Sequence, residues 1–311
     1  MKPLTVVLAK PRGFCAGVER AVTTVENALA AYGPPVYVKH EIVHNRYVID
    51  DLTSKGVIFV DELDAVPEGA ITIFSAHGVS DAVEKQAAAR GLRVIDATCP
   101  LVTKVHNEAI RHEKEGREIV LIGHAGHPEV EGTSGRVNKV YLVESEEDVR
   151  ALRPERPDAL SYVTQTTLSV DDTSDIVAAL KERFPTIKGQ GLNDICYATR
   201  NRQQAVKQLA TMADVIFVIG AANSSNSNRL RDIGQECGVE SYLINDRRDI
   251  DMAWLCNKKT LGVTAGASAP ESLAEELLAF LAERFALSVI PLPDGKEENV
   301  SFRLPAIDGN L

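Results

Sequence analysis

The sequence predicts an α/β protein built from three similar lobes with mainly parallel sheets. Three observations support this fold class. Short β-rich runs alternate with helical stretches along nearly all of the 311 residues. Cys15, Cys99 and Cys196 each lie where a predicted strand ends and a helix begins. Polar loops follow each cysteine at similar offsets, which indicates a repeat of roughly 90 residues, too long for a solenoid unit of about 20–50.

The first predicted elements are a strand at residues 4–9 and a helix that follows it. The helix carries apolar side chains at spacings of four and three, at Val18, Val22, Val25 and Leu29. Helical segments or acidic turns separate most of the later strands, so crossover connections between parallel strands are expected. These strands are short and rich in β-branched residues, and they lie at 36–39, 57–60, 71–75, 93–96, 119–123, 139–143, 161–164, 215–220, 241–244 and 261–264.

The repeat is defined by polar residues at strand ends. One such position comes 28 or 29 residues after each cysteine and another comes 62 to 72 residues after it. Any α/β protein shows strands at regular intervals, but the shared loop chemistry favours three copies of one small lobe. Ligands of such folds bind outside the carboxyl ends of the strands, so three lobes sharing one site would direct these residues inward. The two sets are His44, His127 and Ser224, and His77, Thr166 and Ser268.

Composition excludes several classes of protein. Hydrophobic residues make up 44% and charged residues 25%, as in a globular protein, and the net charge of −10 argues against a nucleic-acid binder that relies on a positive field. The longest apolar run, residues 215–222, is far below the roughly 18 residues of a membrane helix. No signal or transit peptide is expected. Five cysteines form too sparse and odd a set for a disulfide scaffold, which favours a reducing cytoplasm.

One cysteine per lobe favours an iron–sulfur cluster. A zinc finger would show local Cys-x-x-Cys pairs, and the sequence has none. Clusters usually take four cysteines, so three would leave one iron open to a substrate. Three buried structural thiols remain the alternative interpretation of the spacing. Cys237 and Cys256 have no counterpart in the other repeats, and we expect them to be packed structural cysteines.

The polar strand ends predict a cage for a phosphate or diphosphate. All histidines lie between positions 40 and 127, and the third lobe supplies hydroxyl and amide groups, which are poor metal ligands but good hydrogen-bonding partners. The helix expected after Asn226 would add backbone N–H donors. His106 and His112, on the helix after Cys99, are expected to be solvated. The predicted cage residues are His44, His77, His127, Ser224, Ser225, Asn226 and Ser268.

Glu129 is a candidate proton donor, and a solvated surface charge is the alternative interpretation of any single glutamate here. Glu129 lies two residues beyond His127, and a carboxyl group enclosed beside a polyanion has a raised pKa that suits proton transfer. Thr166, at the end of another predicted strand, offers a hydroxyl group to the same site.

No nucleotide motif is present, because neither a Gly-x-Gly-x-x-Gly after a strand nor a P-loop occurs. Redox chemistry would therefore take its electrons from a protein. A small acidic donor would need a local basic patch, for which the candidates are Lys10, Arg12, Arg20, Lys39 and Arg46.

Nine stretches, collinear from the first strand to about residue 300, resemble the 4-hydroxy-3-methylbut-2-enyl diphosphate reductase (LytB-type) family. They are PRGFCAGVERA (11–21), HEIVHNRYVID (40–50), FSAHGVS (74–80), DATCPLVTKVH (96–106), GHAGHPEVEGT (123–133), TQTTLSVDDTSD (164–175), DICYATRNRQ (194–203), NSSNSNRL (223–230) and GVTAGASAP (262–270).

This resemblance implies three α/β lobes around a pseudo-threefold axis and a central [4Fe–4S] cluster with three cysteine ligands and one open iron. The ligands fall on Cys15, Cys99 and Cys196, and the cage residues named above become diphosphate ligands. Glu129 becomes the proton relay, and Thr166 assists it and binds substrate. The implied reaction is reductive dehydroxylation of (E)-4-hydroxy-3-methylbut-2-enyl diphosphate to isopentenyl and dimethylallyl diphosphates, the last step of the non-mevalonate isoprenoid pathway.

The expected domains follow from the repeat and the resemblance together. They are lobes at 14–97, 98–193 and 194–284, with residues 1–13 assigned to the third lobe and a closing tail at 285–311. A cytoplasmic monomer that takes electrons from flavodoxin or ferredoxin, and binds neither nucleic acid nor membrane, is expected.

Two other functions are less consistent with these residues. A non-enzymatic iron–sulfur or redox sensor would not need a diphosphate cage. A zinc hydrolase acting on a phosphorylated substrate would not need three thiolates spread over three lobes.

Overall fold

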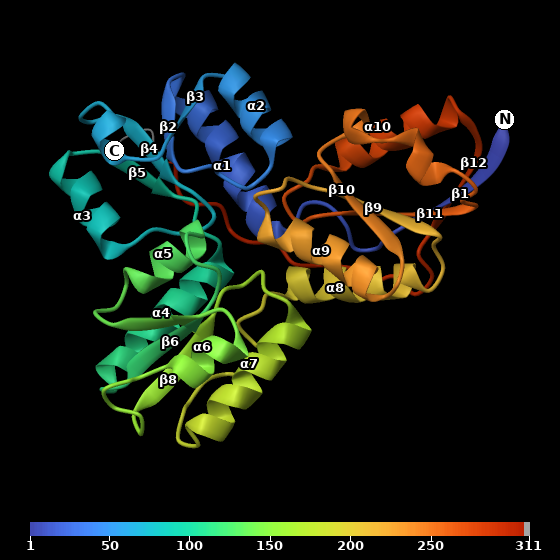
Figure 1. Ribbon diagram of the computed structural model, residues 1–311. Coiled ribbons are helices and arrows are strands. Elements are labelled where there is room, and N and C mark those ends of the chain that lie inside the picture. Colours follow the sequence, from blue (N-terminus) through green and yellow to red (C-terminus); the bar gives the residue numbers. More distant parts are fainter. Residues whose placement is uncertain (308–311) are drawn as a thin grey trace. The chain divides into compact units, whose positions relative to one another are not determined.

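The computed structural model describes residues 1–307 (Figure 1). The chain divides into two compact units. The first unit contains Met1–Val18, His44–Asp51 and Tyr197–Ser301. The second contains Glu19–Val43, Leu52–Cys196 and the described residues from Phe302 onward. Helices α1 (Ala16–Tyr32) and α2 (Arg46–Ser54) each begin in the first unit and end in the second.

The first unit is built on a five-stranded sheet of order β10-β9-β11-β1-β12, in which every neighbouring pair is parallel. Its strands are β1 (Lys2–Leu8), β9 (Val215–Ile219), β10 (Glu240–Ile244), β11 (Thr260–Ala265) and β12 (Phe285–Pro291). The helices are α8 (Tyr197–Ala210), α9 (Ser225–Glu236) and α10 (Glu271–Ala282), and short 3-10 helices lie at Arg247–Asp249 and Met252–Leu255.

Helices cover both faces of this sheet. On one face, α10 packs Leu273 and Leu277 against strand residues such as Phe217. On the other face, Val206 of α8 and Leu230 of α9 pack in a second cluster with strand residues. Burial on both faces explains why β9 reads as an uninterrupted apolar run, as parallel strands do.

The second unit contains two smaller parallel sheets. The first has the order β3-β2-β4-β5, with β2 (Val36–Lys39), β3 (Val57–Val60), β4 (Ile71–Phe74) and β5 (Arg93–Asp96). Helix α3 (Asp81–Ala89) and the 3-10 helix Leu63–Ala65 pack apolar side chains into its core.

The second of these sheets has the order β7-β6-β8 and consists of β6 (Glu118–Ile122), β7 (Val140–Val143) and β8 (Leu160–Thr164). Helix α7 (Val170–Arg183) packs into one core cluster of this sheet, and α4 (Pro100–Lys114) packs into another. Helices α5 (Pro128–Ser134) and α6 (Glu146–Ala151) follow β6 and β7.

These three parallel sheets confirm the predicted α/β class. The predicted strands recur with shifts of one or two residues, but β12 was not anticipated as a strand. The sequence predicts a tail that begins at residue 285, and in the structure residues 285–291 pair with β1 along seven residues at the edge of the sheet. No helix within residues 1–307 is long and apolar enough to cross a membrane.

Candidate active site

Each of the three repeat cysteines stands at the beginning of a helix. Cys15 immediately precedes α1, Cys99 is the N-cap residue of α4, and Cys196 immediately precedes α8. None of the three forms a disulfide within the described residues, and each is of intermediate exposure. A helix N-terminus favours negative charge, so each position suits a thiolate ligand.

The backbone ties each cysteine to one of the polar strand ends that define the repeat. The backbone N–H group of each cysteine donates a hydrogen bond of 3.0–3.2 Å to a backbone carbonyl. Each acceptor belongs to one of the strand ends His77, Thr166 and Ser268, or to the residue just before it. For Cys15, Cys99 and Cys196 the acceptors are, in turn, the carbonyls of Ala267, Ala76 and Thr166. The same local geometry at all three sites supports a threefold repeat of the cysteine segments.

The three thiols are divided between the two units. Cys15 belongs to the first unit, and Cys99 and Cys196 belong to the second. Neither unit alone supplies three, and within residues 1–307 no group of three or more His, Cys, Asp or Glu side chains is gathered to hold a metal ion. The donor chemistry nevertheless fits an iron–sulfur cluster, because thiolates are its usual ligands and all three cysteines, none of them in a disulfide, lie at equivalent helix starts.

Helix α9 provides the anion-binding candidate of the first unit. Ser224 is its N-cap, and the Ser224 hydroxyl accepts a hydrogen bond from the backbone N–H of Ser227 at 3.3 Å. Gly220 and Gly266 allow this helix start to approach the strand ends, because a Cβ atom at either glycine would lie within 2.2 Å of the Ser227 hydroxyl. Ser225 occupies the first helical position. A helix start of this kind can donate backbone N–H groups to an anion.

Asn226 is the most unusual polar residue of this helix start. Its side chain is 4% exposed, and neither its amide nitrogen nor its carbonyl oxygen has a hydrogen-bond partner within the described residues. Buried polar atoms without partners destabilise a fold, so they are rare in proteins. An oxyanion that accepts from the amide would remove part of this cost.

His44 and Ser268 come together beside this helix. The Ser268 hydroxyl donates to the carbonyl of His44 at 2.9 Å. The Nδ1 atom of His44 lies 3.4 Å from the amide nitrogen of Asn223, the residue before the α9 N-cap. Five predicted cage residues, His44, Ser224, Ser225, Asn226 and Ser268, therefore belong to one part of the first unit.

The other two predicted cage residues, His77 and His127, are neighbours in the second unit. Their ring centroids lie 5.7 Å apart in an edge-to-face arrangement. His127 is the N-cap of α5, and its Nδ1 atom accepts from the backbone N–H of Glu129 at 3.1 Å. Because Nδ1 accepts, the ring proton is assigned to Nε2, which can donate to an anion.

Glu129 and Thr166 form a buried pair in the same unit. The carboxylate of Glu129 accepts from the backbone N–H of Thr166 at 2.6 Å and from its hydroxyl at 3.0 Å. Both residues are buried, with 3% and 5% of their surfaces exposed. Glu129 lies in the first turn of α5, two residues after the N-cap residue His127.

Burial raises the pKa of Glu129 from 4.5 to about 7, and the two hydrogen bonds from Thr166 oppose part of that shift. Near pH 7 the carboxyl group is therefore divided between its acid and its carboxylate. A group with this balance can both give and regain a proton at neutral pH.

This shift predicts a pH-dependent stability. The folded state binds the Glu129 proton more tightly than the unfolded state, so the contribution of this group to stability is fully present below about pH 4.5 and is lost as pH rises through about 7. We expect Glu129→Gln to have little effect on unfolding at pH 5 and to stabilise the ligand-free protein by about 3 kcal/mol at pH 8. Urea denaturation of both proteins at the two pH values measures the difference.

The matched control is Glu131→Gln, because Glu131 lies on the same helix and is exposed. The change in the free energy of unfolding that Glu131→Gln causes should be the same at pH 5 and pH 8. An equal stability change for Glu129→Gln at pH 5 and pH 8 would contradict the raised pKa.

Gln165 is a supporting residue of this loop. Its side-chain oxygen accepts from the backbone N–H of His124 at 3.0 Å, and its amide nitrogen donates to the Thr167 hydroxyl at 2.9 Å. The side chain thus joins the loop after β8 to the loop after β6. The sequence signal for it was its position beside Thr166.

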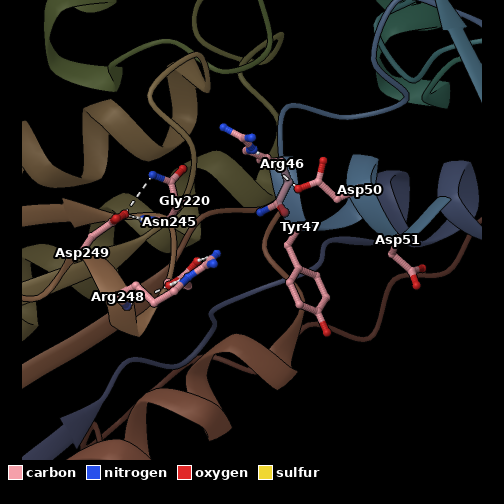
Figure 2. Close-up of a pocket in the computed structure, with 10 residues that line it drawn as sticks. Arg46, Tyr47, Asp50, Asp51, Gly220, Asn245, Arg248 and Asp249 are labelled. Carbon is pink, nitrogen blue, oxygen red and sulfur yellow. Dashed lines mark hydrogen bonds and ion pairs between the residues drawn. The ribbon is translucent and has the colours of Figure 1, made fainter. Parts of the chain in front are cut away.

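A separate cavity of about 560 Å³ lies in the first unit (Figure 2). It is lined by residues after His44 and by the ends of β9 and β10, but by none of the predicted site residues. Both of its arginines form ion pairs within the lining: Arg46 pairs with Asp50 at 3.5 Å and Arg248 with Asp246 at 2.7 Å. Asp51 and Asp249 add further carboxylates to the lining, so the cavity is net acidic and does not suit an anionic substrate.

Several expectations about other residues were wrong. His106 and His112 are buried, not solvated, and burial together with Arg136 lowers the pKa of His106 to about 4. His106 packs so closely on Gly78 that a Cβ atom there would lie 2.7 Å from its ring. Cys237 and Cys256 are exposed, not packed in the core.

The basic residues suggested for docking a protein donor are mostly engaged within the protein. Lys39 is buried and its ammonium group donates to the carbonyl of Asp61, which removes it from any docking surface. Lys10 pairs with Glu297 and Arg12 with Glu271. Arg20 donates to backbone carbonyls, and Arg46 pairs with Asp50.

Comparison with known proteins identifies the family. The sequence profile of the LytB protein family matches residues 6–282. A 4-hydroxy-3-methylbut-2-enyl diphosphate reductase from Bradyrhizobium diazoefficiens is 58% identical over 304 residues, which cover 97% of this chain and 98% of the relative.

Two solved structures share the fold. The E-1-hydroxy-2-methyl-but-2-enyl-4-diphosphate reductase of Plasmodium falciparum superposes with a TM-score of 0.92 at 40% identity, covering 97% of this chain and 96% of that one. A reductase described as the terminal enzyme of the non-mevalonate pathway superposes with a TM-score of 0.65 at 35% identity, covering 90% of this chain and 99% of the other. The chain belongs to the LytB family.

Proposed function

We propose that the chain reduces (E)-4-hydroxy-3-methylbut-2-enyl diphosphate to isopentenyl and dimethylallyl diphosphates, the last step of the non-mevalonate isoprenoid pathway. The allylic C–O bond breaks, a C–H bond forms, and the hydroxyl group leaves as water after uptake of two electrons and two protons. Membership of the LytB family supports the substrate class and the reaction. The observation that supports this chemistry most directly is the buried contact between Glu129 and Thr166, in which the pKa of the Glu129 carboxyl group is about 7.

Cys15, Cys99 and Cys196 would hold a [4Fe–4S] cluster with one open iron, and their equivalent positions at three helix starts support this assignment. When bound, such a cluster supplies electrons and a Lewis acid site for an oxygen ligand.

Seven side chains would bind the diphosphate. Imidazole N–H, hydroxyl and amide groups can donate to phosphate oxygens, and the start of α9 adds backbone N–H groups. The strongest support is the buried amide of Asn226, which has no other partner within the described part of the chain. The proposed ligands are His44, His77, His127, Ser224, Ser225, Asn226 and Ser268.

Glu129 would deliver the proton that converts the leaving hydroxyl into water. Hydroxide is a poor leaving group, so an acid positioned beside it lowers the barrier. The Thr166 hydroxyl, which donates to Glu129 at 3.0 Å, would bind the substrate's hydroxyl and hold the proton path in line. Burial keeps bulk water away from the carboxyl group, which preserves its protonated fraction at neutral pH.

Asn226→Leu tests the cage directly. We expect KM to rise at least about tenfold, because a hydrogen bond to a charged group is lost, while thermal stability is unchanged or improved. Asn228→Leu is the contrasting variant, since that amide donates to the carbonyls of Ala222 and Ser224 at 2.7 and 2.9 Å and its loss should lower Tm. An unchanged KM in Asn226→Leu would remove this residue from the cage.

The electron donor would be a flavodoxin or a ferredoxin, and the enzyme would work as a cytoplasmic monomer. The absence of a nucleotide motif supports a protein donor. Reduced flavodoxin and ferredoxin should each be tried as the sole reductant, and sedimentation of the purified protein measures its oligomeric state.

Anaerobic purification tests the proposed class of enzyme. The protein should be brown, contain iron and sulfide, and bind the substrate in a calorimetric titration. A brown protein that does not bind the diphosphate would indicate a redox sensor. A colourless protein with one zinc ion would indicate a hydrolase.

A further inference from the structure

We propose that Arg20, Lys104 and Arg202 are positioning residues for the three cysteines. Each lies on the helix that begins at one cysteine and holds the loop that precedes a different cysteine. The inference rests on the proposed function, because it treats these cysteines as cluster ligands. It adds three residues to the site that bind neither substrate nor iron.

Arg20 lies on α1, the helix that follows Cys15. Its Nη1 atom donates to the carbonyl of Thr98 at 3.0 Å, and its Nη2 atom donates to the carbonyl of Asp96 at 3.3 Å. These carbonyls belong to the loop that ends at Cys99. Arg20 therefore restrains the second cysteine from the helix of the first.

Lys104 repeats this arrangement on α4, the helix that follows Cys99. Its ammonium group donates to the carbonyl of Asn193 at 3.1 Å and to the carboxylate of Asp194 at 3.3 Å. The side chain of Asp194 is fully buried, so the contact fixes the loop just before Cys196.

Arg202 completes the set on α8, the helix that follows Cys196. Its Nη2 atom donates to the carbonyls of Gly13 and Phe14 at 2.8 and 3.4 Å, and its Nε atom donates to Gly13 at 3.2 Å. Arg202 is 0% exposed, and the carboxylate of Glu298 at 3.2 Å balances its charge. Arg202, on the helix that follows Cys196, therefore restrains the loop before Cys15.

The three cations occupy equivalent places in the repeat. Each comes five or six residues after its own cysteine, and each donates to backbone carbonyls just before the next cysteine in cyclic order. Hydrogen bonds from charged donors are stronger than those between neutral groups. If the cations only stabilised the fold, they would not need to contact the loop before the next cysteine in every repeat. If they fix the three ligand loops, this regular pattern is required.

Two of the cations also bind the segment near the C-terminus. Arg202 contacts Glu298, and the Nε atom of Arg20 donates to the carbonyl of Arg303 at 2.9 Å. Each contact lies within one unit. The tail thus shares its anchoring residues with two of the cysteine loops.

Site-resolved alkylation of the anaerobic holoprotein tests the proposal. Iodoacetamide is added, samples are quenched at intervals, and each cysteine is followed by peptide mass spectrometry. In Lys104→Met, the alkylation rate of Cys196 should rise at least about tenfold, equivalent to ~1.4 kcal/mol of lost restraint, while that of Cys99 stays unchanged. In Arg20→Met, Cys99 should gain reactivity and Cys15 should not.

For the buried Arg202 the test variant is Arg202→Lys, which keeps a charge beside Glu298 but removes the forked donors. In this variant the alkylation rate of Cys15 should rise and that of Cys196 should stay unchanged.

Arg117 and Lys139 provide two control positions, because each is a cation with similar polar contacts that lie outside the cysteine loops. Arg117 donates to the carbonyls of Leu160 and Thr186 at 2.6 and 2.8 Å, and Lys139, which is 42% exposed, pairs with the buried Glu118 at 3.7 Å. Arg117→Met and Lys139→Met should leave the alkylation of every repeat cysteine unchanged.

Cys237 and Cys256 are exposed and provide reference rates in every sample. If the repeat cysteines of the unaltered protein react as fast as these two, the cluster assignment itself is wrong. Suppose instead that the repeat cysteines of the unaltered protein react more slowly than these two. The positioning role would then be overturned if a variant raised the alkylation rate of the cysteine that begins its own helix, or raised the rates of all three repeat cysteines equally.

Discussion

Replacing Cys15, Cys99 or Cys196 by serine should give a colourless protein without measurable turnover. Iron–sulfur clusters are held by thiolates, and a serine hydroxyl is a poor substitute for this soft ligand. With only three protein ligands proposed, the loss of any one leaves two attachment points. Iron and sulfide content, visible absorbance and turnover measured on the same anaerobic preparation would show the effect.

Cys237→Ser and Cys256→Ser are the matched controls, because both thiols are exposed and lie outside the repeat. Both variants should retain full iron content and turnover. If either loses its iron while a repeat-cysteine variant keeps it, the repeat has identified the wrong cysteines.

Glu129→Gln should reduce turnover at least about a hundredfold, the lower end of what general acid–base catalysis contributes. Glutamine keeps the shape of the side chain and can still accept from the backbone N–H of Thr166, but it has no proton to donate as an acid. Cluster content and substrate binding should survive, since neither depends on this carboxyl group. Steady-state kinetics and iron analysis of one preparation separate these effects.

The pH dependence of the unaltered enzyme provides a second measure of the same role. Because Glu129 must be protonated to act as an acid, kcat/KM should fall as pH rises above about 7. Glu131→Gln, on an exposed position of the same helix, should keep both turnover and profile. Near-normal turnover in Glu129→Gln would reject the acid role, and loss of the cluster would show that the residue is structural.

The features that the sequence predicted well are those that repeat. A cysteine at a strand–helix junction and polar residues at fixed offsets recur three times, so each copy supports the others. The structure gives the three cysteines the same backbone hydrogen bond and the same place at a helix start. Parallel strands also carry a strong local signal, because burial on both faces leaves apolar runs such as β9.

The features that were missed depend on contacts between distant segments. His106 is buried on α4 and packs closely on Gly78, which lies in the loop between β4 and α3. Strand β12 lies at the sheet edge with most of its side chains exposed, so it lacks the buried pattern of the other strands. Likewise, only tertiary structure shows that Lys39 and Arg20 donate to backbone carbonyls, which no property of a basic side chain reveals in sequence.

The most direct measurement is product analysis with a chemical reductant. Anaerobic protein is mixed with (E)-4-hydroxy-3-methylbut-2-enyl diphosphate and reduced methyl viologen, and the products are separated by liquid chromatography and mass spectrometry. Our account predicts isopentenyl and dimethylallyl diphosphates with the diphosphate group intact and two electrons consumed per molecule. Release of inorganic phosphate or diphosphate, or recovery of unchanged substrate from protein that carries a reduced cluster, would contradict it.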